Sequence, residues 1–166
     1  MNIELLSNKF QVRYIEEYDI QKVYSLCKGN PMYYRYCPPN VTVQGIKNDM
    51  VSLPKNKKPE DKYYIGFYHD NELFAVMDLI SKYPDEETAF IGFFMMNQEH
   101  QGKGEGTNII TDICRYLKNI GFLRIKLGYA KGNPQSEMFW IKNHFIKTGI
   151  ETQADGYVVV LMERQL

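Results

Sequence analysis

The sequence predicts one α/β domain over residues 1–166, built on a mixed, mostly antiparallel sheet of six or seven strands with helices on both faces. Three observations lead to this prediction. The chain has 166 residues, the size of one ordinary domain. Apolar periodicities give the order β-α-α-β-β-β-α-β-α-β. Hairpin-like strands come first in that order and a strand–helix–strand unit comes second, which combines antiparallel and parallel neighbours.

The first third of the chain predicts one strand and two helices. Phe10–Ile15 alternates apolar and polar residues, which is strand periodicity. Asp19–Cys27 has helical spacing and stops at Gly29-Asn30-Pro31. Met32–Asn40, rich in tyrosine and proline, is expected to be a loop. A short helix over Thr42–Met50, capped by its threonine, follows.

The middle of the chain predicts three strands. Tyr63–Tyr68 and Leu73–Ile80 flank His69-Asp70-Asn71-Glu72, which is a hairpin signal with Asp and Asn at the turn. Thr88–Met96 is a nearly continuous apolar run and predicts a central strand buried on both faces.

The remainder predicts two helices and two or three strands. Apolar residues over 109–120 repeat at three and four residues, and Gly121 ends that amphipathic helix. Phe122–Leu127 is expected to be a strand. Asn133-Pro134 predicts the N-cap and first residue of the last helix. We expect that helix to turn these residues toward the core: Met138, Phe139, Ile141 and His144 or Phe145.

The chain end predicts a closing strand over Tyr157–Met162, with a further strand near Phe145–Glu151. No window approaches the length of a membrane span, and the start lacks a signal-like apolar stretch, so no membrane association is expected.

Composition excludes several classes of function. Twenty basic and twenty acidic residues cancel, so no nucleic-acid partner is expected. Three cysteines occur, without a C-x-x-C pair or a Cys/His spacing suited to zinc. We therefore expect no metal, reduced thiols and a cytoplasmic location.

The segment with the clearest chemistry is Gln101-Gly102-Lys103-Gly104-Glu105-Gly106-Thr107, between a predicted buried strand and an amphipathic helix. Glycines let the main chain approach a ligand closely. Amides at a helix N-terminus point outward together and carry partial positive charge, which suits a pyrophosphate. A Walker loop is absent, and neither Gly102 nor Gly104 starts a G-x-G-x-x-G fingerprint.

Gln101–Gly106 instead matches the Q/R-x-x-G-x-G/A turn of the GNAT superfamily of acyl-CoA-dependent N-acetyltransferases. The chain resembles that superfamily from about Phe10 to Met162, in length and in the order of elements. Leu127–Ser136 is similar to the family's strand-to-helix junction, in which an Asn leads the helix that flanks CoA.

The resemblance implies acetyl-CoA as cosubstrate. The pantetheine arm would pair with the backbone of Phe94–Met96, and the glycine turn would hold the pyrophosphate. Asn133 also suits a plain N-cap, and the two methionines also suit ordinary core. The residues assigned to acetyl-CoA are Met95, Met96, Gln101, Gly102, Lys103, Gly104, Glu105, Gly106, Thr107, Asn133 and Ser136.

The reaction that the resemblance implies is direct attack of a primary amine on the acetyl thioester, and this needs a base and an oxyanion donor. Asp78, which interrupts an apolar run, is the candidate catalytic base or substrate contact, and pairing with a structural partner is the alternative. Glu87 is a second candidate. Family members often carry a Tyr general acid where this chain has Trp140, an indole that cannot deliver a proton usefully. Tyr129 and Tyr157 are alternatives that also suit strand packing.

The acceptor pocket of the family is shaped by the loop between the first two helices. Here Tyr33 and Tyr36 of that loop, with Tyr83, predict an aromatic cleft for a small-molecule amine, and a lid that packs on itself is the alternative. A protein or peptide amine is a variant of this function. A non-catalytic acyl-CoA-binding module is the rival, and relatives often form homodimers.

Overall fold

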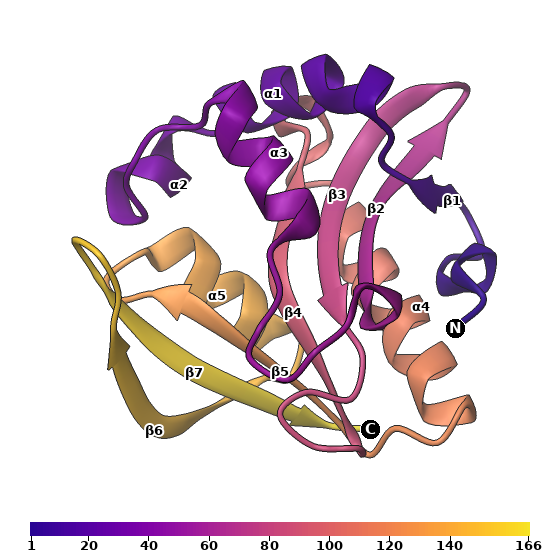
Figure 1. Ribbon diagram of the computed structural model, residues 1–166, viewed down its shortest axis with the longest axis vertical. Helices are drawn as coiled ribbons and strands as arrows, with labels where there is room; N and C mark the ends of the chain where they lie inside the picture. The colour runs from indigo at the N-terminus through magenta and orange to yellow at the C-terminus, as the bar shows by residue number, and fades with distance from the viewer.

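The computed structural model describes residues 1–166 and contains a seven-stranded sheet in the order β1-β2-β3-β4-β5-β7-β6 (Figure 1). Neighbouring strands are antiparallel except β4 and β5, which are parallel. The predicted mixed, mostly antiparallel sheet is therefore confirmed. The strands are β1 (Gln11–Tyr14), β2 (Lys62–His69), β3 (Glu72–Ile80), β4 (Thr88–Met96), β5 (Arg124–Ala130), β6 (Ile146–Gln153) and β7 (Val158–Gln165).

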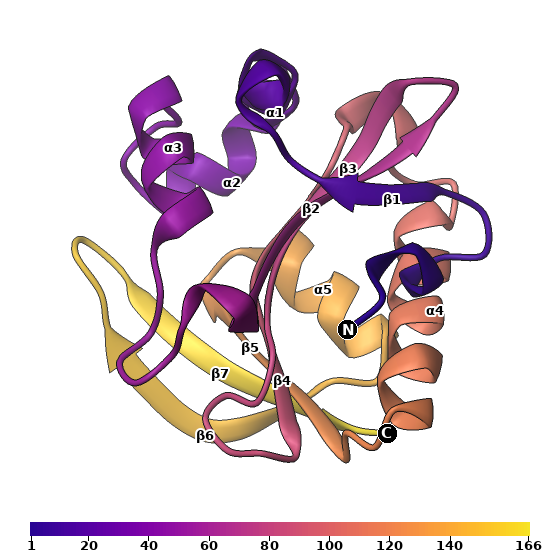
Figure 2. The same ribbon diagram turned by 45° about the vertical axis from the view of Figure 1, so that its right-hand side comes forward.

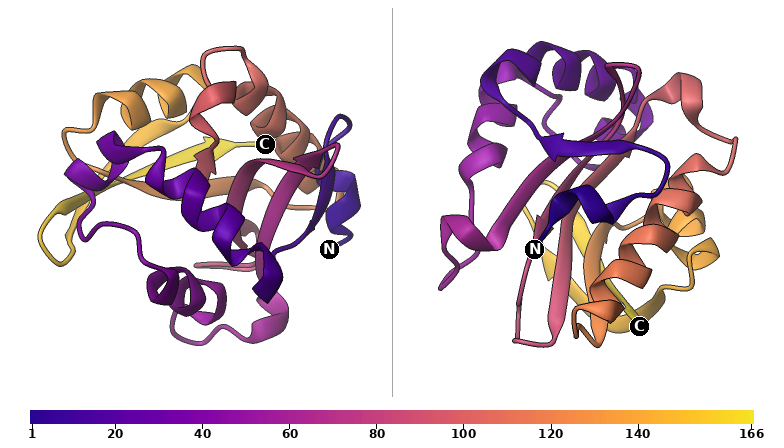
Figure 3. Two further views of the ribbon diagram at one scale, coloured as in Figure 1. Left: turned by 90° about the horizontal axis from the view of Figure 1, so that it is seen from above. Right: turned by 90° about the vertical axis from the view of Figure 1, so that its right-hand side faces the viewer.

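Helices cover both faces of the sheet, as predicted. One group packs on one face and a second group packs on the other (Figures 2 and 3). The first group is α1 (Ile20–Lys28), α2 (Pro31–Tyr36) and α3 (Val43–Val51), and the second is α4 (Glu105–Asn119) and α5 (Pro134–Lys142). Four 3₁₀ turns complete the chain: η1 (Ile3–Leu6), η2 (Glu17–Asp19), η3 (Pro59–Asp61) and η4 (Gln98–His100).

Helix α4 illustrates how the apolar pattern fixes the packing. Ile109, Ile110, Ile113 and Leu117 form one stripe that is fully buried in the larger of two core clusters. The helix ends before Gly121, whose φ of 98° is in the region that glycine adopts without strain. None of the helices is both long and apolar enough to span a membrane.

Two expectations about local structure were wrong. The segment expected to be a loop begins with helix α2, because Asn30-Pro31 starts a new helix as well as ending α1. In α5, Met138 and Ile141 are exposed, whereas Trp140 is buried. The reason is that α5 is short and faces the sheet with Phe139 and Trp140, which leaves the flanking apolar residues outside.

Strands β4 and β5 separate halfway along the sheet. β4 pairs with β3 as far as Met96, but it pairs with β5 only over Thr88–Ile91. Beyond that point β5 continues alone with β7. The register between β3 and β4 shifts at Gly92, so this glycine is a bulge residue. It directly follows Ile91, the last residue of β4 that pairs with β5. One edge of β4 is thus left without a strand partner.

Candidate functional site

The turn before α4 presents a row of backbone amides without acceptors. Gly102 and Gly104 have φ values of 75° and 85°, a conformation that favours glycine. No side chain caps α4, and its first intrahelical bond is donated by the Asn108 amide to the Gly104 carbonyl. The amides of the six residues from Gly102 to Thr107 therefore have no acceptor within the chain.

A cavity of about 270 Å³ joins this turn to the free edge of β4. Its lining comes from α1–α2, β4, the turn and α5. The lining residues are Asn30, Tyr33, Phe94, Met95, Met96, Gln101, Gly102, Gly104, Gly106, Thr107, Asn133, Gln135, Ser136, Phe139, Trp140 and Lys142. Nine of the eleven residues assigned to acetyl-CoA from the sequence lie in this lining, and Lys103 and Glu105 do not.

The free edge of β4 also presents backbone groups. The Asn97 amide donates to the Phe74 carbonyl of β3 at 2.8 Å. Antiparallel strands alternate between residues that bond to the partner strand and residues that face away from it. Counting back from Asn97, the outward-facing residues are Met96 and Phe94, on the side that β5 has left.

Two side-chain amides fix the end of β4. The Nδ2 of Asn30 and the Nε2 of Gln101 both donate to the Met96 carbonyl, at 3.0 and 3.1 Å. Gln101 also donates to Asn30 Oδ1 at 2.7 Å and accepts from Gln135 Nε2 at 3.0 Å. This network ties the glycine turn to α1 and α5, so it sets the position of the turn relative to β4.

Gly106 allows α4 to approach β4 closely. A Cβ atom at this position would lie 2.7 Å from Met96 Sδ and 3.0 Å from Phe139 Cε2. The third glycine of the turn is thus required by packing, whereas Gly102 and Gly104 are required by their backbone conformation.

The side chains of Lys103 and Glu105 point away from the cavity. Lys103 Nζ donates to the Glu99 carbonyl at 2.9 Å. Glu105 forms an ion pair with Lys9, which lowers the pKa of its carboxyl group. Neither residue lines the cavity.

Asn133 begins α5, as the sequence predicts. Its buried Oδ1 accepts from the Ser136 amide at 3.1 Å, which is an N-cap bond. Both residues line the cavity. The N-cap role of Asn133 is confirmed.

The three aromatic residues assigned to the acceptor pocket are not all together. Tyr33 lines the cavity and packs edge-on against Phe93 of β4, with ring centroids 5.7 Å apart. Tyr36 lies beside Gly132 and is absent from the cavity lining. Tyr83 lies at the opposite end of β4, edge-on against Phe90, so the structure does not bring it to the other two.

Asp78 forms a buried ion pair. Both of its carboxylate oxygens accept from Lys62 Nζ, at 2.8 and 2.7 Å. Burial raises the pKa of Asp78, and Lys62 opposes that shift. One oxygen lies over the bare Gly92, where a Cβ atom would be 3.0 Å away. Glu87, in contrast, is exposed and pairs with Arg124.

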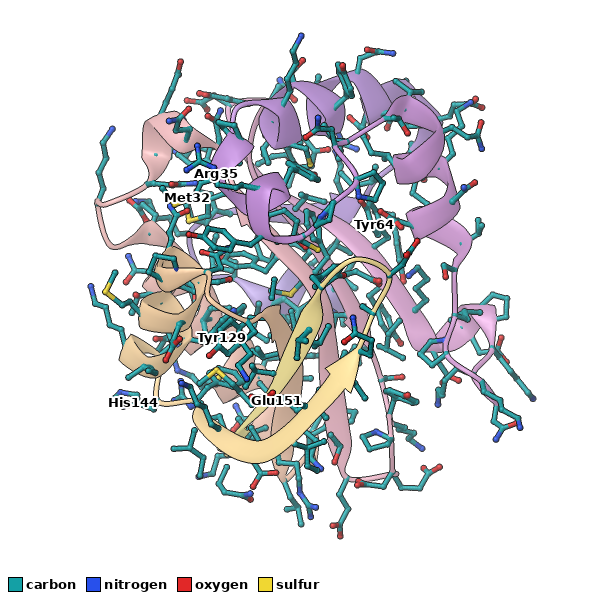
Figure 4. All side chains as sticks on the ribbon, turned by 90° about the vertical axis from the view of Figure 1, so that its left-hand side faces the viewer. Met32, Arg35, Tyr64, Tyr129, His144 and Glu151 are labelled. Carbon is teal, nitrogen blue, oxygen red and sulfur yellow. The ribbon has the colours of Figure 1, made fainter.

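Trp140 packs in the cavity wall, between Phe139 and Phe145, with ring centroids 4.9 and 5.1 Å from its own. Tyr129 lies beside α5, near Glu137, and is absent from the cavity lining (Figure 4). The Tyr157 hydroxyl lies near the Cys37 thiol, and burial, followed by that thiol, raises the pKa of Tyr157 to about 12.

Sequence reasoning missed Asn30, Phe139 and Lys142 in the cavity lining. Asn30 carried a local signal, the Asn-Pro pair, but its bonds to Met96 and Gln101 join residues 66 and 71 positions away. No local pattern predicts such pairs.

Comparisons with known proteins agree with this geometry. The profile of a family described as the acetyltransferase (GNAT) family matches residues 23–145. No curated protein matches the sequence.

Several solved structures share the fold. A crystal structure of an acetyltransferase from Thermus thermophilus has a TM-score of 0.74 and 17% identity, covering 95% of this chain and 97% of its own. The PaiA N-acetyltransferase from Thermoplasma acidophilum, solved with coenzyme A, has a TM-score of 0.67 and 17% identity, covering 95% and 99%. A ribosomal-protein α-N-acetyltransferase, RimL, also solved with coenzyme A, has a TM-score of 0.70 and 16% identity, covering 97% and 96%.

Proposed function

This chain belongs to the acetyltransferase (GNAT) family, and we propose that it transfers the acetyl group of acetyl-CoA to a primary amine of a small molecule. One observation carries the proposal: six consecutive amides, from Gly102 to Thr107, lack acceptors beside a cavity that continues along β4. Such a row at a helix N-terminus suits a diphosphate.

The pantetheine arm of the cofactor would extend the free edge of β4. The outward backbone groups of Phe94 and Met96 are available to its amides, in the manner of an added strand. The Met96 carbonyl already accepts two side-chain donors, so the Phe94 carbonyl and the Met96 amide are the groups that remain for the arm, and the Phe94 amide is left for the thioester. The thioester would then lie near the point where β4 and β5 part.

The amine nitrogen attacks the thioester carbonyl carbon, and a tetrahedral oxyanion forms. The outward Phe94 amide is the proposed donor to that oxyanion. Collapse of the intermediate breaks the carbon–sulfur bond and releases the CoA thiolate. The products are the acetylated amine and CoA, after the nitrogen has lost one proton and the thiolate has gained one.

Asp78 is the proposed base. Its carboxylate lies over Gly92, at the point where β4 and β5 part, and Gly92 has no side chain to cover it. Burial raises the pKa of Asp78 above its ordinary value, which makes the ionised carboxylate a stronger proton acceptor. The bond to Lys62 orients the carboxylate and also opposes its basicity.

A dedicated general acid is not part of this proposal. Trp140 occupies the expected position, and its indole can donate a hydrogen bond but cannot transfer a proton usefully. A thiol has an ordinary pKa of about 8.5, so its thiolate is a tolerable leaving group and takes its proton from water near neutral pH.

Contacts across the entrance to the acceptor side favour a small acceptor over a peptide. The β6–β7 turn approaches the segment after α2, as Figure 1 shows. A Cβ atom at Gly156 would lie 3.4 Å from Pro38 Cγ, and Tyr157 lies near Cys37. An extended chain would have to displace these contacts, whereas a small amine would not. A protein amine, which the ribosomal-protein acetyltransferase takes, is therefore the second candidate.

The proposal is tested with purified protein in two steps. Calorimetry measures the binding of CoA, and release of free thiol from acetyl-CoA is then followed over a panel of small amines and peptides with free N-termini. We expect CoA binding and turnover on small amines. Absence of CoA binding would contradict the proposal outright, turnover only on peptides would assign the second acceptor class, and binding without any turnover would indicate a non-catalytic module.

A further inference from the structure

The amino-terminal segment is docked along the outer face of α4. The Asn8 amide and its Nδ2 donate to the two oxygens of Asp112, each at 2.9 Å, and the Asn2 amide donates to the Tyr116 hydroxyl at 2.8 Å. Lys9 forms an ion pair with Glu105, at the start of the same helix. The segment thus follows one stripe of α4 to its N-terminus (Figure 2).

Glu105 is an acidic residue in an anion-binding turn. A carboxylate in the first turn of a helix is itself attracted to the positive end of the helix dipole. An unpaired carboxylate at this position would compete with a bound diphosphate for the same amides and would also repel it. The position of Glu105 therefore needs a compensating group.

Lys9 provides that compensation. The Glu105 side chain is mostly buried, and Asn108 Nδ2 also donates to it at 3.3 Å. The carboxylate is turned away from the cavity, because Gly104, Gly106 and Thr107 line the cavity while Glu105 does not. Lys9 is half exposed and, like Glu105, does not line the cavity.

We propose that Lys9 is a positioning residue for the diphosphate site, holding the Glu105 carboxylate on the outer side of α4 and offsetting its charge. The inference rests on the proposed function, since it concerns the affinity of the turn for CoA. Lys9 acts through Glu105 and does not touch the ligand. Its contribution should therefore vanish when Glu105 is neutral.

The test is a double-mutant cycle with CoA affinity as the readout. Calorimetry compares wild type, Lys9→Met, Glu105→Gln and the double variant. We expect Lys9→Met to weaken CoA binding about fivefold, the effect of one uncompensated and partly screened charge near a diphosphate. In the Glu105→Gln background the same substitution should change the affinity less than about twofold.

Three controls make the assignment specific. Lys9→Arg should restore the affinity to within about twofold of wild type, because the charge is kept. Lys82→Met removes an equally exposed lysine that pairs with Glu86 at the other end of the sheet, and it should leave the affinity unchanged. Dephospho-CoA, which keeps the diphosphate but lacks the 3′-phosphate, should show the same loss as CoA with Lys9→Met.

Each other outcome overturns the proposal. An equal loss with and without the Glu105 charge would mean that Lys9 acts independently, and a loss confined to CoA would mean that it contacts the 3′-phosphate. If Lys9→Met fails to fold, Glu105→Gln alone decides, because the proposal requires it to bind CoA at least as tightly as wild type. Wild type that binds no CoA would instead refute the proposed function.

Discussion

The side chain of Asn30 donates a hydrogen bond to the backbone carbonyl of Met96, across 66 residues of sequence, at 3.0 Å. This bond joins the start of α2 to the end of β4, where the strand has lost its β5 neighbour. Gln101 donates to the same carbonyl. Asn30, which follows α1 and is the N-cap of α2, thus also fixes the end of β4 that lines the cavity.

Replacing Asn30 by Ala should lower the free energy of unfolding by about 2 kcal/mol. The change removes its bonds to the Leu26 and Met96 carbonyls and leaves one Gln101 donor without its acceptor in a buried place. Urea denaturation measures the loss. Gln44→Ala breaks an exposed amide bond on α3 and should cost under about 0.5 kcal/mol. Equal losses in the two variants would contradict the assigned role of Asn30.

Gly104→Val should weaken CoA binding about tenfold, and Gly104→Asn much less, since Asn adopts the left-handed region far more readily than a β-branched residue does. Nothing lies within 4 Å of a Cβ atom there, so the effect comes from the φ of 85° and not from a clash. Calorimetry with CoA gives the two affinities. Similar affinities for the Val and Asn variants would show that this backbone conformation is not what binds the ligand.

Asp78→Asn should lower kcat about 100-fold, since an amide cannot accept the amine proton. The acid limb of the pH–rate profile, which reports titration of the base, should disappear as well. Glu87→Gln, a carboxylate change at the opposite end of β4, should leave both unchanged. An Asp78→Asn enzyme with the kcat and pH profile of wild type would leave Asp78 as a structural partner of Lys62 only.

Lys62→Met should make stability depend more steeply on pH. The pKa of Asp78 in the folded protein is raised, so the native state binds more protons than the unfolded chain just above the usual Asp pKa, and stability falls there as pH rises. Removing the ammonium raises that pKa further and extends the loss toward neutral pH. We expect a cost of about 3 kcal/mol near neutral pH and a smaller cost in mild acid, at about pH 5.

Urea denaturation at the two pH values measures this difference. Lys82→Met, which breaks an exposed pair, should cost little at either pH. A Lys62→Met cost that is the same at both pH values would show that Asp78 does not titrate in this range.

Trp140→Phe should reduce stability by about 1–3 kcal/mol and leave kcat within about twofold of wild type. The indole fills the cavity wall against Phe94, Phe139 and Phe145, and no proton transfer is assigned to it. Tyr157→Phe should likewise leave kcat nearly unchanged. A loss of kcat of about tenfold in the Tyr157 variant alone would identify its hydroxyl as the general acid.

The sequence contained enough information for the order of strands and helices and for the glycine turn, because these depend on local patterns. The amphipathic stripe of α4 and the Asn-Pro start of α5 are examples. The same Asn-Pro signal at Asn30-Pro31 was interpreted as a stop only, since the tyrosines that follow have no clear periodicity. Local signals therefore gave the positions of helix boundaries, but not always whether a boundary is the end of one helix or the start of the next.

Features that depend on distant segments were harder to predict. Tyr83 has the same composition signal as Tyr33, yet Tyr83 packs on Phe90 near the start of β4, whereas Tyr33 packs on Phe93 and lines the cavity. Asp78 stood out as a carboxylate in an apolar run, but its partner Lys62 lies at the paired end of another strand and could not be identified from spacing. Side-chain partners across strands require the register, which only the structure supplies.

The short pairing of β4 with β5 has a mechanical consequence. Four residue pairs, Thr88–Ile91 with their β5 partners, are the seam between two plates, one made of β1–β4 and the other of β5–β7. A molecule bound where β4 and β5 have separated would contact both plates and hold them in a fixed relative position. Amide hydrogen exchange in both plates should then slow when that molecule is added, even at residues far from it.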